Sequence, residues 1–325
     1  MKKFLSVILA AILAAGCLSA CSSGGSKPAE EPGRIQIVTT IFPEYDWVMN
    51  ILGDYQASAD VTMLLDTGVD LHSFQPTAAD ILKISTCDLF VYVGGESDEW
   101  VEDALKEATN KDMIVIKLLD VLGDAVKEEE VIEGMQEEDH EHEEDEAEYD
   151  EHVWLSLKNA AVLVNSIADS IQKVDPDNAG SYQKNAAAYI EKLNALDKEY
   201  QSAVSDAAVT TLLFGDRFPF RYLVDDYGLS YYAAFVGCSA ETEASFETIT
   251  FLAQKADELS LSAVMTIEGT DHRIAETIVQ NAKTKDLQIL TMDSMQSVTA
   301  KDVENGTSYL SIMEKNLSVL KDALK

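Results

Sequence analysis

The sequence predicts an α/β protein of two lobes, each a parallel sheet flanked by helices, with one long helix between the lobes. Short apolar runs typical of strands alternate with helical patterns, which favours parallel sheets covered on both faces. These runs form two sets, separated by a long stretch with helical periodicity. The chain has 325 residues, more than one hydrophobic core usually holds.

The N-terminus has the pattern of a lipoprotein export signal. Two lysines precede an apolar stretch, residues 4–15, that is too short for a membrane-spanning helix. Leu-Ser-Ala-Cys, ending at Cys21, matches a lipobox better than the sequence ending at Cys17 does. We expect residues 1–20 to be a signal peptide and residues 21–33 a flexible tether. A lipid on Cys21 would then anchor the protein to the outer face of the cytoplasmic membrane, with no membrane-spanning helix in the mature protein.

Residues 34–176 are assigned to an N-terminal lobe. Apolar runs predict strands, and amphipathic patterns predict one helix over residues 77–85 and another beginning at Ser156. The expected strands are residues 35–40, 59–65, 89–93 and 113–117.

An acidic segment interrupts this lobe. Residues 128–151 hold fifteen of the 58 Asp and Glu residues, and such a composition predicts disorder. His140 and His142 lie within it. It is either a solvated acidic loop or a weak metal-capturing segment beside a tighter site.

Residues 177–208 form the predicted linking helix. Apolar residues recur every three or four positions from Tyr182 to Tyr200, and residues 181–208 contain no Gly or Pro. A helix of about 27 residues is about 40 Å long, enough to run along both lobes.

Residues 209–325 form the predicted second lobe. Its expected strands are residues 211–214, 231–235, 263–267 and 287–291, with a helix over 245–260.

Composition restricts the class of ligand. The formal net charge of −34 argues against nucleic acid and anionic lipid as partners and favours cations. Four cysteines are too few for a disulfide scaffold. Cys87 and Cys238 remain after export, and we expect no bridge between them because they fall in different lobes.

Two histidines are the strongest candidates for metal ligands. His72 and His152 lie in short polar segments, in a chain with only five histidines. Asp70 and Asp150 each stand two residues before one of them. Either could fix a histidine tautomer by accepting a hydrogen bond, or simply form a local turn.

Two aspartates follow predicted strands of the second lobe. Asp216 follows the strand expected to end at residue 214, and Asp293 follows the strand expected to end at residue 291. Ligands of open α/β sheets bind beyond the carboxyl ends of strands. We therefore expect a cleft between the lobes with the two histidines on one side and Asp293 on the other.

Several motifs, in order, resemble those of the zinc/manganese solute-binding lipoproteins that feed metal-specific ABC importers. They are residues 38–47, the His72 segment, residues 89–95, 152–156, 227–229 and 292–294. The resemblance implies an extracytoplasmic, monomeric receptor that captures Zn²⁺, or alternatively Mn²⁺, and delivers it to a permease. It also implies that the long helix is a rigid backbone for the two lobes.

The same resemblance places His72, His152 and Asp293 on metal-ligand positions of the family. The remaining position, counted back from Tyr227, falls on Arg217, which cannot bind a cation. This residue is the one departure from the pattern.

Several residues could replace that ligand. Asp216 and Cys238 are alternatives, and a thiolate would favour zinc over manganese. Glu241 is a third, and water would complete the site if Arg217 filled the position.

Other functions compete with the receptor hypothesis. A metal-dependent hydrolase could use two histidines and a carboxylate, with Glu268 as general base. The sequence contains no HExxH, GxSxG or P-loop pattern. An adhesin function rests only on descriptions of the resembling family.

Overall fold

The computed structural model describes residues 33–136, 148–239 and 242–325. The expected signal peptide, lipidated Cys21, His140, His142 and Glu241 lie outside the described residues. In the described part of the chain, no helix is long and apolar enough to cross a membrane.

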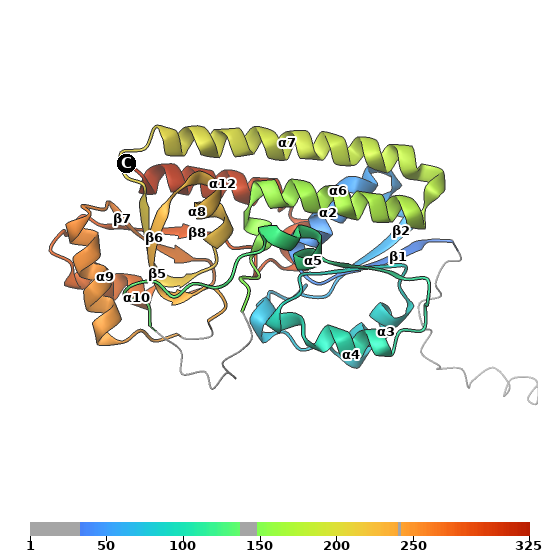
Figure 1. The fold of residues 1–325 in the computed structure, drawn as a ribbon, viewed down its shortest axis with the longest axis horizontal. Coiled ribbons are helices and arrows are strands. Elements are labelled where there is room, and N and C mark those ends of the chain that lie inside the picture. The colour runs from blue at the N-terminus through green and yellow to red at the C-terminus, as the bar shows by residue number, and fades with distance from the viewer. Residues whose placement is uncertain (1–32, 137–147, 240–241) are drawn as a thin grey trace, which may run out of the picture. The chain divides into compact units, whose positions relative to one another are not determined.

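The first lobe is built on a four-stranded parallel sheet with the order β2-β1-β3-β4. Its helices cover both faces, with α2 and α6 on the side of α7, and α3 and α4 on the opposite side (Figure 1). The strands are β1 Ile35–Thr39, β2 Ala59–Met63, β3 Leu89–Tyr92 and β4 Ile114–Lys117. The helices are α2 Phe42–Leu52, α3 Ala78–Thr86, α4 Trp100–Lys106, α5 Leu118–Leu122 and α6 Leu157–Val174.

The second lobe repeats this plan with the order β6-β5-β7-β8, again parallel. Helix α12 lies between its sheet and α7, and α9 and α10 cover the far side (Figure 1). The strands are β5 Thr211–Phe218, β6 Ser230–Val236, β7 Ala263–Ile267 and β8 Gln288–Met292. The helices are α8 Arg221–Tyr227, α9 Phe246–Glu258, α10 Arg273–Asn281, α11 Ala300–Glu304 and α12 Tyr309–Ala323.

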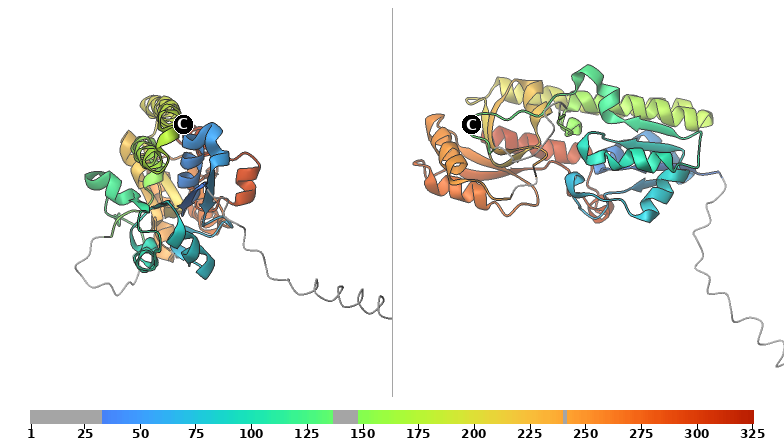
Figure 2. Two further views of the ribbon diagram at one scale, coloured as in Figure 1. Left: turned by 90° about the vertical axis from the view of Figure 1, so that its right-hand side faces the viewer. Right: turned by 60° about the horizontal axis from the view of Figure 1, so that its bottom comes forward.

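Helix α7 Ala179–Ser205 runs along both lobes, as Figures 1 and 2 show. It has 27 residues and buries one apolar seam, because residues three or four apart share a helix face. The seam packs on α2 and α6 in the first lobe and on α8 and α12 in the second. Its residues are Tyr182, Ala186, Tyr189, Leu193, Leu196, Tyr200 and Val204. The predicted fold class is confirmed.

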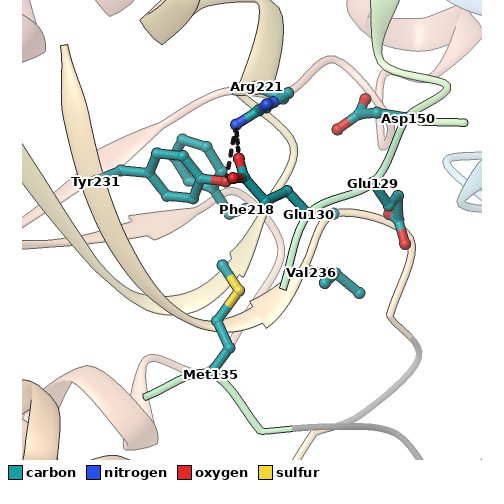
Figure 3. Close-up of a pocket in the computed structure, with 9 residues that line it drawn as sticks. Glu129, Glu130, Met135, Asp150, Phe218, Arg221, Tyr231 and Val236 are labelled. Atoms are coloured by element: carbon teal, nitrogen blue, oxygen red, sulfur yellow. Dashed lines mark hydrogen bonds and ion pairs between the residues drawn. The ribbon is translucent and has the colours of Figure 1, made fainter. Parts of the chain in front are cut away.

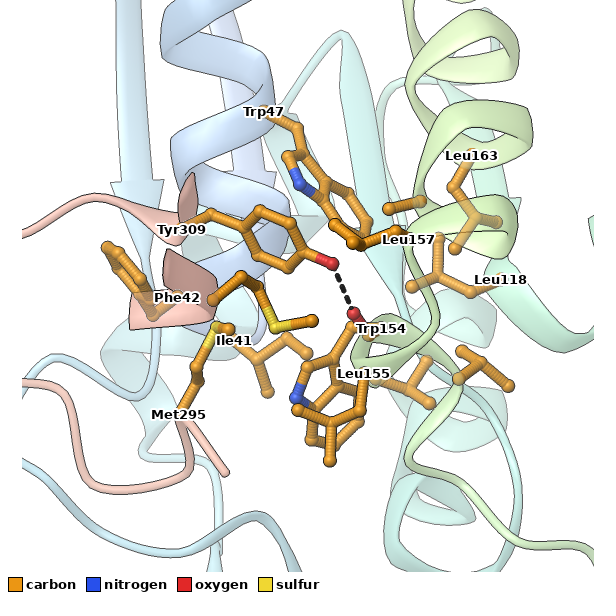
Figure 4. Close-up of a cluster of buried hydrophobic side chains, with 14 of the residues drawn as sticks. Ile41, Phe42, Trp47, Leu118, Trp154, Leu155, Leu157, Leu163, Met295 and Tyr309 are labelled. Atoms are coloured by element: carbon orange, nitrogen blue, oxygen red, sulfur yellow. Dashed lines mark hydrogen bonds between the residues drawn. The ribbon is translucent and has the colours of Figure 1, made fainter. Parts of the chain in front are cut away.

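One hydrophobic core continues from the first lobe into the second. At the boundary, the Trp154 indole nitrogen donates to the Ser294 carbonyl at 2.9 Å. The Tyr309 hydroxyl of α12 donates to the Trp154 carbonyl at 2.6 Å, next to the edge-on contact of Tyr309 with Trp47 (Figure 4). Trp154 and its short turn, Val153–Leu155, are thereby tied to the second lobe.

The structure differs from expectation at the ends of the acidic segment. Residues 128–136 and 148–151 were expected to be disordered, yet Glu128 pairs with Tyr149 as an antiparallel bridge. The Gln136 amide donates to the Ala234 carbonyl of β6 at 2.9 Å, and Met135 is buried. The composition did not predict this order, because the ends are held by backbone pairing and a few apolar contacts, which mean hydropathy does not reflect.

Candidate metal centre

His72 lies in a single 3-10 turn, Leu71–Ser73, beyond the end of β2. Asp70 caps this turn, and its Oδ1 accepts from the His72 amide at 3.0 Å. The other Asp70 oxygen pairs with the Arg217 guanidinium of β5. Asp70 therefore fixes the backbone of His72, which is the local-turn role, the second of the two expected of it.

The His72 ring is instead oriented by two residues that the sequence did not single out. Its Nδ1 lies 2.7 Å from the Ser97 hydroxyl and 3.5 Å from a Glu151 carboxylate oxygen. The other Glu151 oxygen accepts from the Ser97 amide at 2.8 Å. Glu151 adjoins His152 in the sequence, but its contact with His72 depends on the fold.

His152 directly precedes the 3-10 turn Val153–Leu155, which leads into α6, and its side chain is fully buried. One oxygen of Asp150 accepts from the His152 amide at 2.9 Å and contacts its Nδ1 at 3.0 Å. A carboxylate on Nδ1 holds the proton there and leaves Nε2 as the metal-binding atom. The hydrogen bond expected of Asp150 is present.

The two imidazoles meet with their Nε2 atoms 3.2 Å apart. Two nitrogens bound to one tetrahedral zinc, at about 2.0–2.1 Å each, are separated by about 3.3 Å. Both rings are held from behind through Nδ1. The pair is therefore already spaced as two ligands of one small cation.

The pKa values of the two rings move in opposite directions. Burial and the neighbouring His152 ring lower the pKa of His72 to about 3. Burial also acts to lower the pKa of His152, but the Asp150 carboxylate outweighs it and raises that pKa. Asp150 therefore favours the protonated form of His152, and a cation can bind its Nε2 only when that atom carries no proton.

Cys238 is the third member of this cluster. Its sulfur and one ring nitrogen from each of His72 and His152 all lie within 4.8 Å of one another. It follows β6 in the second lobe, and its amide donates to Glu129 at 3.0 Å. Across the described ranges, this is the one set of three His, Cys, Asp or Glu residues with such spacing.

Asp216 does not join the cluster. The sequence had suggested that Asp216 lies beyond the end of its strand. Strand β5 continues to Phe218, so Asp216 instead lies within the strand. One carboxylate oxygen accepts from the Arg217 amide at 3.0 Å. The other accepts from the Thr270 hydroxyl at 2.9 Å and the Ile267 amide at 3.3 Å. Both oxygens are engaged within the second lobe.

Asp293 follows β8, as expected, but lies outside the cluster of three. Its Oδ1 accepts from the Met295 amide at 2.8 Å. Burial and the Glu268 carboxylate raise the pKa of Asp293 to about 6. Its role as a ligand stays a prediction.

Glu268, considered above as a general base, accepts hydrogen bonds from the loop that follows Asp293. Its two oxygens accept from the Ser294 amide at 2.6 Å, the Ser294 hydroxyl at 2.8 Å and the Gln296 amide at 3.1 Å.

The ordered ends of the acidic segment border the centre. Glu130 pairs with Arg221, whose guanidinium also lies 3.5 Å from the Tyr231 hydroxyl (Figure 3). Glu129 and Asp150 line the same small pocket (Figure 3). Carboxylates of this segment therefore lie beside the histidine pair.

Fold and centre together define a two-lobed α/β protein with a candidate metal centre of two histidines and a cysteine. Residues 37–323 match the family described as zinc-uptake complex component A, periplasmic, and the chain belongs to this family. The zinc-binding lipoprotein AdcA of Streptococcus pneumoniae serotype 4 is 35% identical over 325 residues, covering 99% of this chain and 61% of that protein. The high-affinity zinc uptake system protein ZnuA of Bacillus subtilis is 31% identical over 318 residues, covering 94% of this chain and 93% of that protein.

A solved structure shares the fold. The Zn(II)-bound ZnuA-like domain of pneumococcal AdcA superposes with a TM-score of 0.69 at 32% identity, covering 90% of this chain and 99% of that domain. The chain spans about three fifths of the full AdcA relative, whose covered share is 61%.

Proposed function

We propose that this protein is an extracytoplasmic receptor that captures Zn²⁺ between its lobes and delivers it to the permease of an ABC importer. The observation that carries the proposal is the pair of Nε2 atoms at 3.2 Å, each on a ring fixed through Nδ1. Two imidazoles suit zinc better than manganese, which prefers oxygen ligands. The names of the AdcA and ZnuA relatives support zinc.

Substitution of either histidine tests the proposal. We expect His72→Ala and His152→Ala each to weaken zinc binding about tenfold or more, because each removes a ligand from a preformed site. His272→Asn is the matched control. His272 caps α10 with φ 58°, a conformation that Asn tolerates, and it is not in the cluster.

Isothermal titration of the metal-stripped protein with Zn²⁺ and Mn²⁺ gives the affinities. Circular dichroism of each variant shows whether the fold is retained. Unchanged zinc affinity in both folded histidine variants would rule out this site.

The anchor and the acidic segment complete the proposal. A lipid on Cys21 would hold a monomeric receptor at the membrane near its permease, and Cys21→Ala should move the protein from the membrane fraction to the medium. His140 and His142, with the surrounding acidic residues, would raise the local cation concentration. Deleting residues 137–147 should remove weak zinc sites and leave the tight site.

A further inference from the structure

We infer that Cys238 supplies the third metal ligand as a thiolate, so that the receptor takes thiophilic cations, Zn²⁺ and Cd²⁺, in preference to Mn²⁺. The inference rests on the proposed function, since it names the ligand class of the same site. Its basis is the convergence of one sulfur and two ring nitrogens from separate segments within 4.8 Å.

The spacing fits tetrahedral coordination. With Zn–S near 2.3 Å and Zn–N near 2.0–2.1 Å, ligand atoms lie about 3.3–3.6 Å apart. The 4.8 Å limit on the cluster leaves only a small movement of the cysteine side chain to reach this spacing. His72 and His152 come from the first lobe and Cys238 from the second, so the metal would bridge the two lobes.

The loop after β6 is shaped to bring Cys238 to the histidines. A Cβ on Gly237 would lie 2.9 Å from the Phe218 carbonyl and 3.0 Å from His152 Cε1. Glycine therefore lets this backbone pass directly against the ring of His152. Glu129 accepts from the Cys238 amide at 3.0 Å and fixes the next residue.

Glu129 also serves the chemistry of coordination. Its carboxylate hydrogen-bonds with the Cys238 thiol, and burial together with this carboxylate raises the pKa of the thiol, so the metal-free site holds the sulfur protonated. When sulfur bonds to the metal, the thiol proton leaves, and this carboxylate is the adjacent base. Sulfur contributes the electron pair of the new bond and nothing is oxidised.

Two side chains of the second lobe considered at this position, Arg217 and Asp216, are already engaged. Arg217, at the position expected for a ligand, is paired with Asp70. Asp216 accepts hydrogen bonds through both oxygens. A sulfur donor in place of an oxygen or nitrogen donor shifts selectivity toward soft cations, since Mn²⁺ binds carboxylate, carbonyl and water oxygens.

The test compares Cys238→Ser with Cys87→Ser in the full chain carrying Cys17→Ser and Cys21→Ser. Cys87 is the matched control, because it is buried in the core of the first lobe and lies outside the cluster. Cobalt is the spectroscopic probe, since a Co²⁺–thiolate bond gives an intense near-ultraviolet charge-transfer band. Titrations with Cd²⁺, Zn²⁺ and Mn²⁺ give affinities.

The chain that carries only Cys17→Ser and Cys21→Ser is the background protein. We expect the cobalt band in this background protein and in Cys87→Ser, and its loss in Cys238→Ser. Cd²⁺ affinity of Cys238→Ser should fall about tenfold or more while Mn²⁺ affinity changes little, because only the soft donor is lost. A retained band, or unchanged Cd²⁺ affinity, overturns the inference. If His72→Ala still weakens zinc binding about tenfold or more in that case, the proposed function stands.

A background protein that binds none of these metals overturns both proposals. If Cys238→Ser does not fold, alkylation of the background protein decides. Zinc should shield Cys238 from iodoacetamide, as judged by peptide mass spectrometry, and full alkylation at saturating zinc contradicts the inference.

Discussion

At the scale of single residues, Gly237 sets the space available to the His152 ring. A Cβ there would lie 3.0 Å from Cε1 and 3.1 Å from Nδ1, the nitrogen held by Asp150. The ring or the loop must move to accept a methyl group. We expect Gly237→Ala to weaken zinc binding about tenfold, or ~1.4 kcal/mol.

Titration calorimetry of Gly237→Ala measures this loss. Gly180→Ala is the control, because a Cβ on Gly180 meets nothing within 4 Å. Equal zinc affinity in both variants would show that the close approach at Gly237 does not constrain the ring.

The residues of the centre were predictable to different degrees. His72 and His152 stood out as rare imidazoles in polar segments. Asp216 and Cys238 could not be separated, since the sequence did not show that β5 continues through Asp216. The pairing of Arg217 with Asp70 joins residues far apart in sequence, so no local pattern could reveal it.

At the scale of elements, a hydrogen bond to an ionisable side chain, Asp46, joins α2 to α7. Asp46 Oδ2 accepts from the Tyr189 hydroxyl at 3.0 Å and from Asn50 at 3.1 Å. Burial raises the pKa of Asp46 from 3.8 to about 6. Because this carboxyl has a higher pKa in the folded than in the unfolded state, it favours folding at pH values below its unfolded-state pKa. That contribution to stability is lost as pH rises through about 6.

Asp46→Asn removes this titration and keeps an oxygen acceptor. We expect the free energy of unfolding of the variant, relative to the natural protein, to rise between pH 4 and pH 8 by on the order of 2 kcal/mol. Urea unfolding at both pH values measures the difference, and Asp54→Asn on the surface is the control. A pH-independent difference would show that Asp46 keeps an ordinary pKa.

A second hydrogen bond between elements joins α12 to the turn after His152. The Tyr309 hydroxyl and the Trp154 carbonyl, 2.6 Å apart, are both buried. Tyr309→Phe leaves that carbonyl without its donor, which should destabilise the fold by about 1–3 kcal/mol. Thermal unfolding of Tyr309→Phe and of Tyr149→Phe, an exposed control, measures the loss. Equal stability would mean that this bond does not couple the lobes.

The elements themselves were the most predictable part of the fold. The seam of α7 and the eight strands follow from periodicity and apolar runs, which depend on local sequence. The ordered ends of the acidic segment did not, because the Glu128–Tyr149 bridge and the contact of Gln136 with β6 join distant parts of the chain.

At the scale of the whole molecule, the two lobes share a hydrophobic cluster and one long helix. Buried residues of both lobes belong to the same hydrophobic cluster, and α7 packs on both. Separating the lobes by a hinge would expose part of this core to water, at about 25 cal/mol per Å² of apolar surface. We therefore expect metal to bind without a large closure of the lobes.

Small-angle X-ray scattering of the metal-stripped and zinc-loaded protein tests this expectation. The proposed ligand atoms of His72, His152 and Cys238 already lie within 4.8 Å of one another, so we expect zinc to need only side-chain movement to bind them all. The radius of gyration should be the same in both states within experimental error. His72→Ala with added zinc controls for binding elsewhere on the acidic surface. A zinc-dependent contraction in the natural protein, absent from His72→Ala, would show that the lobes close on the metal despite their shared core.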